Sequence, residues 1–133
     1  APSVLFWSSH QMPLYPGSGH REEQGVGNII NLPLAPGADS GAFREAWRRE
    51  ALPAVAAFAP DLVLVSAGFD AHERDPLGQL LLKDTDYEWI TREIMALAQD
   101  SAGGRVVSIL EGGYDLQALS TASRAHVSAL QKI

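Results

Sequence analysis

A short apolar run at residues 62–65, Leu-Val-Leu-Val, is the clearest structural signal in the sequence. It is too short for a helix and rich in β-branched residues, which is typical of a strand buried on both faces. The run ends in small residues, and Asp70 follows where the chain leaves the strand. Because α/β proteins bind ligands at the carboxyl ends of parallel strands, Asp70 is a candidate metal ligand or general base. Hydrogen bonding of its carboxylate to loop amides is an equally good explanation.

The same pattern predicts three more strands, around residues 3–7, over 27–32 and over 105–110. An irregular segment at residues 11–25 separates the first two, and its prolines and glycines predict a loop long enough to suggest a functional role. Helix-type spacing follows the second, third and fourth strands. The order β, β, α, β, α, β, α therefore predicts a parallel sheet covered by helices.

The first predicted helix spans residues 39–58. Asp39 or Ser40 can cap its amino end, and Pro53 should bend it because proline removes one backbone hydrogen bond. Apolar residues recur at three- and four-residue spacing, which places them on one buried face. This face is expected to carry Phe43, Trp47, Ala51, Val55 and Phe58.

Two more helices are predicted in the second half of the chain. Thr85, with Glu88 three residues later, forms a capping-box pattern for a helix that ends at residues 103–104. Its inner face is expected to carry Tyr87, Ile90, Ile94 and Leu97. Asp115 opens the last helix. The expected inner face of that helix is Leu116, Leu119, Ser123, Val127 and Leu130.

Composition places limits on the class of protein. The chain has 133 residues, 46% of them hydrophobic, which suits a single domain over residues 1–133 with a real core. A net charge of −6 argues against a surface for nucleic acid or anionic membrane. We see no apolar run of membrane-spanning length and no signal peptide. The chain contains no cysteine, so a metal site has to use Asp, Glu or His, and a cytoplasmic location is expected.

Polar residues follow three of the predicted strands: Ser-Ser-His at 8–10, Asp70, and Gly-Gly-Tyr at 112–114. In a parallel sheet these residues emerge at one edge. A phenol near a metal can donate a hydrogen bond to an oxyanion, and glycines let the backbone approach a substrate closely. The alternative is that residues 111–114, Glu-Gly-Gly-Tyr, form only a turn between a strand and a helix.

Five motifs occur in order along the chain. They are Ser9-His10 with Tyr15-Pro-Gly-Ser-Gly19, Gly27-Asn-Ile-Ile-Asn31, Leu62-Val-Leu-Val-Ser-Ala-Gly-Phe-Asp-Ala-His72, Asp75-Pro-Leu-Gly78, and Val107-Ser-Ile-Leu-Glu-Gly-Gly-Tyr-Asp-Leu116. Together they resemble the zinc-dependent histone deacetylase family, above all its bacterial class II-like members, the histone deacetylase-like amidohydrolases and acetylpolyamine amidohydrolases. The resemblance implies an arginase-like α/β fold of three layers, α/β/α, with a mainly parallel sheet. It also implies hydrolysis of acetyl-lysine-type or acetylpolyamine amides.

The resemblance implies a role for each residue that matches a family motif. Asp70 would be a zinc ligand, the second of two carboxylates in that site. Tyr114 would be the catalytic phenol that polarises the acetyl carbonyl and stabilises the tetrahedral oxyanion. Gly112 and Gly113 would line the active-site loop and contact substrate.

Further matches concern the substrate tunnel and structural cations. Tyr15 falls where the family places an aromatic wall of the acyl-lysine tunnel, and Leu77 where it places an apolar rim residue. Ser8 and the carbonyl of Ser9 match a site for a monovalent cation, usually potassium. The carbonyl of Asn28 matches part of a second such site.

The sequence contains only part of the metal site that the resemblance implies. The family's zinc also needs an Asp-x-His pair from an earlier strand, and a His-His pair earlier still activates its water; neither pair is in this sequence. The chain resembles the carboxyl-terminal half of the catalytic domain, with one of three zinc ligands and no general base. Because a catalytic zinc keeps three protein ligands, we expect this chain alone to be inactive. Its exposed sheet edge is expected to bind a missing amino-terminal half or a second copy.

The four histidines are expected to have structural or solvated positions. Asp70-Ala-His72 imitates an Asp-x-His pair, but the family's histidine at this position is not a ligand, so His72 should pack on the loop or line the cleft rim. His10 is interpreted as structural, or as a residue that contacts the residues of the site without contacting a ligand. His20 should be solvated, and His126 should be a satisfied surface or core histidine.

Two alternatives to a deacetylase stay open at this point. A truncated, non-catalytic relative would act as an oligomeric or binding module and take up no zinc. A different α/β enzyme would use Asp70, His72 and Glu73 as a new site. Ser66 and Ser108 do not indicate a serine hydrolase, because the Gly-x-Ser-x-Gly elbow is missing.

Overall fold

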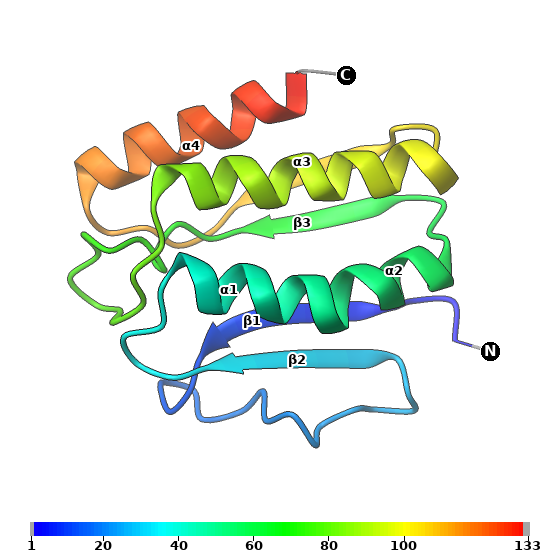
Figure 1. Cartoon of the computed structure of the whole chain (residues 1–133), viewed down its shortest axis with the longest axis horizontal. Helices are drawn as coiled ribbons and strands as arrows, with labels where there is room; N and C mark the ends of the chain where they lie inside the picture. The colour runs from blue at the N-terminus through cyan, green and yellow to red at the C-terminus, as the bar shows by residue number, and fades with distance from the viewer. Residues whose placement is uncertain (1, 132–133) are drawn as a thin grey trace.

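Parallel strands with helices packed on one side form the molecule (Figure 1). The computed structural model describes residues 2–131. The strands are β1 (Phe6–Gln11), β2 (Ile29–Leu34), β3 (Val63–Ala67) and β4 (Val106–Leu110). The helical segments are α1 (Ser40–Ala46), η1 (Trp47–Ala51), α2 (Leu52–Phe58), α3 (Asp84–Ser101) and α4 (Leu116–Gln131). The predicted order of elements is confirmed. None of the described helices is long and apolar enough to cross a membrane.

The strands pair in two separate parallel pairs, β1 with β2 and β3 with β4, whereas the sequence predicted one sheet. Trp7 stands opposite Ile30 in the first pair, and Val65 opposite Ser108 in the second. β2 also continues through Pro33, where the sequence predicted its end. Proline fits there because the backbone of Leu34 faces β1, so that Pro33, which has no N–H, faces away from the ladder.

The helix predicted over residues 39–58 is continuous through α1, η1 and α2. Asp39 caps it, since its carboxylate accepts a hydrogen bond from the N–H of Ala42 at 3.1 Å. Just before Pro53 the helix widens into the π-helical turn η1, whose end is marked by the N–H of Leu52 bonding to the carbonyl of Trp47. This wider turn accommodates the proline. Most of the expected face is buried, namely Phe43, Trp47, Ala51 and Val55, whereas Phe58 is exposed.

Two predictions for the later helices are wrong. α3 begins at Asp84, and its first turn is capped by the carboxylate of Asp86, which accepts the N–H of Lys83 at 2.9 Å, and not by Thr85 with Glu88. The inner face of α4 is also rotated from the predicted one. The buried residues of α4 are Ala118, Ala122, His126 and Ala129, whereas Leu116 is 84% exposed. Small residues face α3 because the two helices pack closely along their length.

The core lies between the strands and the helices. Its main cluster contains Leu32, Leu34, Phe43, Trp47, Ala51, Ala67, Phe69, Leu80, Leu82, Tyr87 and Ala122. The opposite face of β3 and β4 is exposed: Leu64 is 64% and Ile109 is 59% accessible to solvent. β3 is therefore buried on one face only, because none of the described helices covers the other face.

Candidate functional site

A groove of about 1470 Å³ contains most of the residues that the sequence singled out. It runs along β1 and β3 and reaches the loops that follow both strands. Seven of the eight predicted site residues line it: Ser8, Ser9, Tyr15, Asp70, Leu77, Gly112 and Tyr114. The expectation that Asp70 and the loop of Tyr114 converge on one site agrees with this arrangement. The prediction that residues 8–10 follow the first strand is wrong, because β1 continues through them to Gln11.

The carboxylate of Asp70 sits between two glycines at the end of β3. A Cβ atom at Gly112 would lie 2.7 Å from Oδ2, and one at Gly68 would lie 3.0 Å from Oδ1. Among the described residues, no donor is hydrogen-bonded to this exposed carboxylate. The alternative in which Asp70 only bonds loop amides is therefore not supported. Its oxygens are free to bind a ligand.

Tyr114 projects from the loop after β4, and its side chain is 56% exposed. Its backbone N–H donates to Oδ2 of the buried Asp75 at 2.9 Å. The other oxygen of Asp75 accepts the N–H groups of Leu77 at 2.9 Å and Gly78 at 3.2 Å. One carboxylate thus joins the loop of Tyr114 to the loop of Leu77. Asp75 precedes Pro76, which is a recognisable turn signal, but no local pattern predicts its contact with the loop of Tyr114.

Gly113 is the predicted site residue that does not line the groove. Its φ of +141° suits glycine, and a Cβ there would stand 3.1 Å from side-chain atoms of Phe69 and Leu119. Gly113 therefore allows the tight turn after β4 without lining the groove itself. Tyr15 and Leu77 lie at the groove's rim with exposed side chains. Their positions agree with a wall and a rim, but those roles stay predictions.

Ser8 and Ser9, in the middle of β1, already have protein partners. Nε2 of His10 donates to the carbonyl of Gly19 at 2.7 Å, so Nδ1 accepts the hydroxyl hydrogen of Ser8 at 3.0 Å. The hydroxyl of Ser9 accepts a hydrogen bond from Nε1 of Trp47 at 3.0 Å. His10 is therefore structural, as expected. Cation binding at Ser8 and the Ser9 carbonyl stays a prediction.

His72 is buried, and both of its ring nitrogens are bonded. Nδ1 accepts the N–H of Arg74 at 3.1 Å, and Nε2 donates to Asp84 at 3.0 Å. Asp84 also accepts the hydroxyl of Thr121 at 2.9 Å, which ties the loop to α4. The expectation that His72 packs on its loop is confirmed. A new site built from Asp70, His72 and Glu73 would lack a free histidine. His20 is exposed, as predicted.

The described residues do not fit a complete zinc site. Within residues 2–131, no three His, Asp or Glu side chains gather as metal ligands. Asp70 is the carboxylate that the groove offers at the predicted position. Tyr87 also lines the groove, and its buried hydroxyl has no hydrogen-bond partner within residues 2–131. Burial, together with the negative charge of Asp70, raises the pKa of Tyr87 well above its ordinary value.

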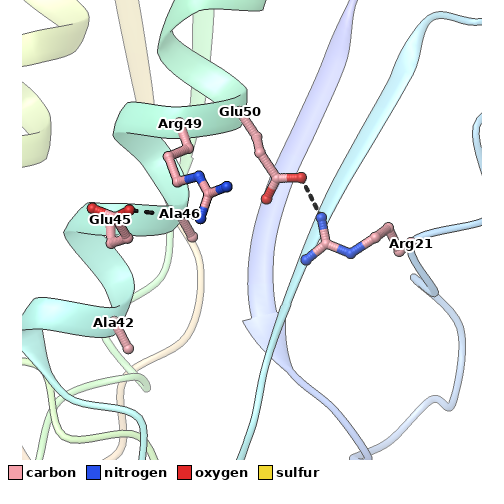
Figure 2. A pocket seen from close by; sticks show the side chains of 6 residues that line it. All are labelled: Arg21, Ala42, Glu45, Ala46, Arg49 and Glu50. Carbon is pink, nitrogen blue, oxygen red and sulfur yellow. Dashed lines mark hydrogen bonds and ion pairs between the residues drawn. The ribbon is translucent and has the colours of Figure 1, made fainter.

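A smaller hollow of about 500 Å³ lies between the loop at residues 12–28 and the helix of α1 and η1 (Figure 2). Figure 2 shows Arg21 pointing to Glu50 across it, and Arg49 paired with Glu45 at 3.8 Å. These charges are exposed and mutually neutralised. The ion pair between Arg21 and Glu50 joins the loop to the helix, and each charged residue that lines the hollow is in an ion pair.

Sequence comparisons relate the chain to deacetylases. The histone deacetylase domain model matches residues 1–130. Histone deacetylase 14, chloroplastic, from Arabidopsis thaliana is 40% identical over 124 residues, covering 90% of this chain and 29% of that protein. A probable deacetylase from Archaeoglobus fulgidus is 40% identical over 118 residues, covering 86% of this chain and 33% of that protein.

Solved structures share the fold. The HD domain of HDA15 superposes with a TM-score of 0.88 and 35% identity, covering 97% of this chain and 38% of that one. An acetylpolyamine aminohydrolase from Burkholderia pseudomallei gives a TM-score of 0.85 and 30% identity, again covering 97% and 38%. The predicted α/β fold of the deacetylase type is confirmed. The chain spans roughly a third of the length of these relatives.

Proposed function

Because the chain belongs to the histone deacetylase domain family, we propose that it forms part of the catalytic centre of a zinc-dependent deacetylase. The reaction would be hydrolysis of an acetyl-lysine-type or acetylpolyamine amide. The similarity to proteins named as deacetylases and to an acetylpolyamine aminohydrolase supports this proposal.

One juxtaposition carries the proposal: Asp70 and Tyr114 line the same groove. The carboxylate of Asp70 is open between two glycines, and the loop of Tyr114 is fixed by Asp75. A carboxylate and an exposed phenol in one groove can supply a metal ligand and a donor to an oxyanion, and metal-assisted amide hydrolysis uses both.

Each of the chain's site residues would have a separate role in binding or catalysis. Asp70 would supply one carboxylate to a zinc ion that needs further ligands from outside the described residues. The hydroxyl of Tyr114 would donate a hydrogen bond to the acetyl oxygen as negative charge develops there. Tyr15 and Leu77 would hold the acyl-lysine stem at the groove's rim. A potassium ion at Ser8 and Ser9 would serve a structural role.

The cytoplasmic location and the bacterial source stay predictions. They are supported by the absence of cysteine and by the resemblance to bacterial amidohydrolases. Among the relatives are plant proteins named as chloroplastic.

A chimeric enzyme tests the proposal. This chain would replace the segment that it matches in the Burkholderia pseudomallei acetylpolyamine aminohydrolase. We expect zinc uptake and hydrolysis of an acetyl-lysine peptide or an acetylpolyamine, measured by amine release. Tyr114→Phe should lower kcat by about 10²- to 10³-fold with zinc content unchanged, because it removes one oxyanion donor.

The matched control is Gln117→Ala, an exposed position three residues away that should keep full activity. A zinc-loaded chimera in which Tyr114→Phe is as active as the parent would contradict the assignment. Asp70→Ala should remove the zinc, as shown by elemental analysis.

A non-catalytic binding module is the second candidate, because the described residues hold one metal carboxylate and no cluster of ligands. In this case the chimera would fold and remain free of zinc. Stoichiometric zinc in the 133-residue chain by itself, lost on Asp70→Ala, would argue against the binding module.

A further inference from the structure

The phenol loop, residues 111–115, lies against the rim loop, residues 68–79, at one end of the molecule (Figure 1). The phenol loop follows β4 and carries Tyr114, and the rim loop follows β3 and carries Asp70. A Cβ atom at Gly112 would lie 2.7 Å from Oδ2 of Asp70. A Cβ atom at Gly113 would lie 3.1 Å from Cβ of Phe69. The two loops therefore pack so closely that side chains at these glycines would collide with the rim loop.

Two hydrogen bonds join the phenol loop to the rim loop. The carbonyl of Gly112 accepts the N–H of Phe69 at 2.7 Å, next to the proposed metal ligand Asp70. The N–H of Tyr114 donates to Oδ2 of Asp75 at 2.9 Å. Of these two bonds, the one to Asp75 involves the residue that carries the phenol. The position of Tyr114 relative to Asp70 therefore depends on where the rim loop holds the carboxylate of Asp75.

The rim loop gives Asp75 a fixed place because the loop is itself bonded to the rest of the fold. The N–H of Asp75 donates to the carbonyl of His72 at 2.9 Å, and the ring of His72 donates to Asp84 at 3.0 Å. The N–H of Glu73 donates to the carbonyl of Leu82 at 2.8 Å. Asp75 and His72 are both buried. The carboxylate of Asp75 is thus held from its own backbone as well as by its acceptor bonds.

Asp75 divides its two oxygens between the two loops. Oδ2 accepts the N–H of Tyr114 in the phenol loop. Oδ1 accepts the N–H groups of Leu77 at 2.9 Å and Gly78 at 3.2 Å in the rim loop. The side chains of Tyr114 and Leu77 are both exposed and both line the groove, whereas Asp75 does not line it. One buried carboxylate therefore sets the backbone positions of two groove residues relative to each other.

We propose that Asp75 is a positioning residue for the deacetylation, holding Tyr114 where its hydroxyl can reach an acetyl oxygen bound beside Asp70. This inference rests on the proposed function. Asp75 would contact neither substrate nor metal, because it does not line the groove, and it acts through the backbone of Tyr114. Such an effect can be large, since a misplacement of about 1 Å can cost about 10²-fold in rate.

Asp75→Asn separates the two halves of this role. An amide side chain has one oxygen that accepts hydrogen bonds and one NH₂ group that only donates. We expect the oxygen to keep the two N–H donors of Leu77 and Gly78, which leaves the NH₂ group against the N–H of Tyr114. The rim loop then stays in place, and the phenol loop loses its bond.

The first test measures kcat and KM in the zinc-loaded chimera with an acetyl-lysine peptide. Asp75→Asn should lower kcat by about tenfold to 10²-fold, with KM within about twofold of the parent value and zinc content unchanged. The matched control is Glu73→Gln, the same chemical change at an exposed position of the rim loop, which should alter neither constant. An unchanged kcat in Asp75→Asn, or a rise in KM alone, would overturn the proposal.

The second test asks whether Asp75 acts through the phenol. In Tyr114→Phe no hydroxyl remains to be misplaced, so the addition of Asp75→Asn should lower kcat no further. A general structural defect would lower kcat in both backgrounds. Multiplied losses in the double variant would therefore contradict the positioning role.

Exchange of backbone amides provides a measurement that does not depend on catalysis. In the parent chimera the amides of Leu77, Gly78 and Tyr114 should all be protected, since they share one carboxylate. Asp75→Asn should release the amide of Tyr114 alone. An unprotected Tyr114 amide in the parent, or release of all three amides in the variant, would count against the proposal.

These results distinguish the positioning role from the proposed function. A zinc-loaded chimera that is inactive, or that is unaffected by Tyr114→Phe, contradicts the function and the positioning role with it. A chimera that is impaired by Tyr114→Phe but not by Asp75→Asn overturns the positioning role alone. If Asp75→Asn does not fold, Asp75→Glu takes its place in both kinetic tests, because it keeps the carboxylate but displaces it by one methylene group.

Discussion

Asp75 shows how much a single residue can organise at the candidate site. It is buried, yet its carboxylate is satisfied by three backbone N–H groups, those of Leu77, Gly78 and Tyr114. Hydrogen bonds to a charged acceptor are stronger than neutral ones. Asp75 therefore fixes the loop that carries Tyr114, the proposed catalytic phenol, although Asp75 itself does not line the groove.

Replacing Asp75 should loosen this loop. Asp75→Ala leaves three N–H groups without their acceptor, so we expect a loss of about 2–4 kcal/mol in the free energy of unfolding, measured by urea titration. The amide resonance of Tyr114 should also broaden or shift. The exposed Glu73→Gln is the matched control and should change neither quantity. An unchanged amide resonance in Asp75→Ala would show that other contacts hold the loop.

Part of the candidate site could be predicted from the amino-acid sequence alone, and part could not. Asp70 and Tyr114 could be placed because each follows an apolar strand in a short motif. Asp75 could not, and Tyr87 was predicted only as part of the inner face of its helix, because the site contacts of both residues depend on distant partners. Asp75 meets Tyr114 across 39 positions of sequence. The pKa of Tyr87 depends on its burial and on Asp70.

At the scale of elements, His126 joins α4 to two neighbours. The hydroxyl of Thr91 on α3 donates to the carbonyl of Tyr87 at 2.6 Å, so its oxygen accepts Nδ1–H of His126 at 2.7 Å. Nε2 then accepts the hydroxyl of Ser108 on β4 at 2.7 Å. The neutral ring is fully satisfied, which confirms the expectation of a satisfied core histidine. The ring lies on the buried face of α4 together with Ala118, Ala122 and Ala129.

This network predicts a pH-dependent stability. Burial lowers the pKa of His126 below its usual 6.5. As pH falls through 6.5 the unfolded chain binds a proton that the folded chain does not, so stability present above pH 6.5 is lost below it. We expect urea unfolding from pH 7.5 to 5.0 to show this loss, with a shallower slope in His126→Gln.

The control for this experiment is His20→Gln, a substitution at an exposed histidine outside the network. It should keep the wild-type dependence on pH. Parallel profiles for the wild type and His126→Gln would mean that other groups set the acid response.

At the scale of the whole molecule, the helices cover one face of β3 and β4 and leave the other open. Leu64 stands opposite Val107 on the open face, and Ile109 lies beside them; all three side chains are exposed. Contiguous exposed apolar surface favours association.

We therefore expect the 133-residue chain by itself to self-associate as its concentration rises, as measured by sedimentation velocity. Ile109→Lys should shift it toward monomer, because a charge in the contact must be desolvated. Leu116→Lys on the exposed side of α4 is the control and should leave the association unchanged. A chain that is monomeric at every concentration, or an equal effect of the two lysines, would contradict the expectation.

The sequence by itself determined the order of the elements, the α/β class, the family and the positions of Asp70 and Tyr114 after their strands. These features depend on local spacing of apolar and polar residues and on short motifs, and both can be read along the chain. Only the tertiary structure decided that the strands form two separate pairs, that alanines and His126 face α3, and that Asp75 holds the loop of Tyr114. These features depend on contacts between residues far apart in sequence, which local patterns do not encode.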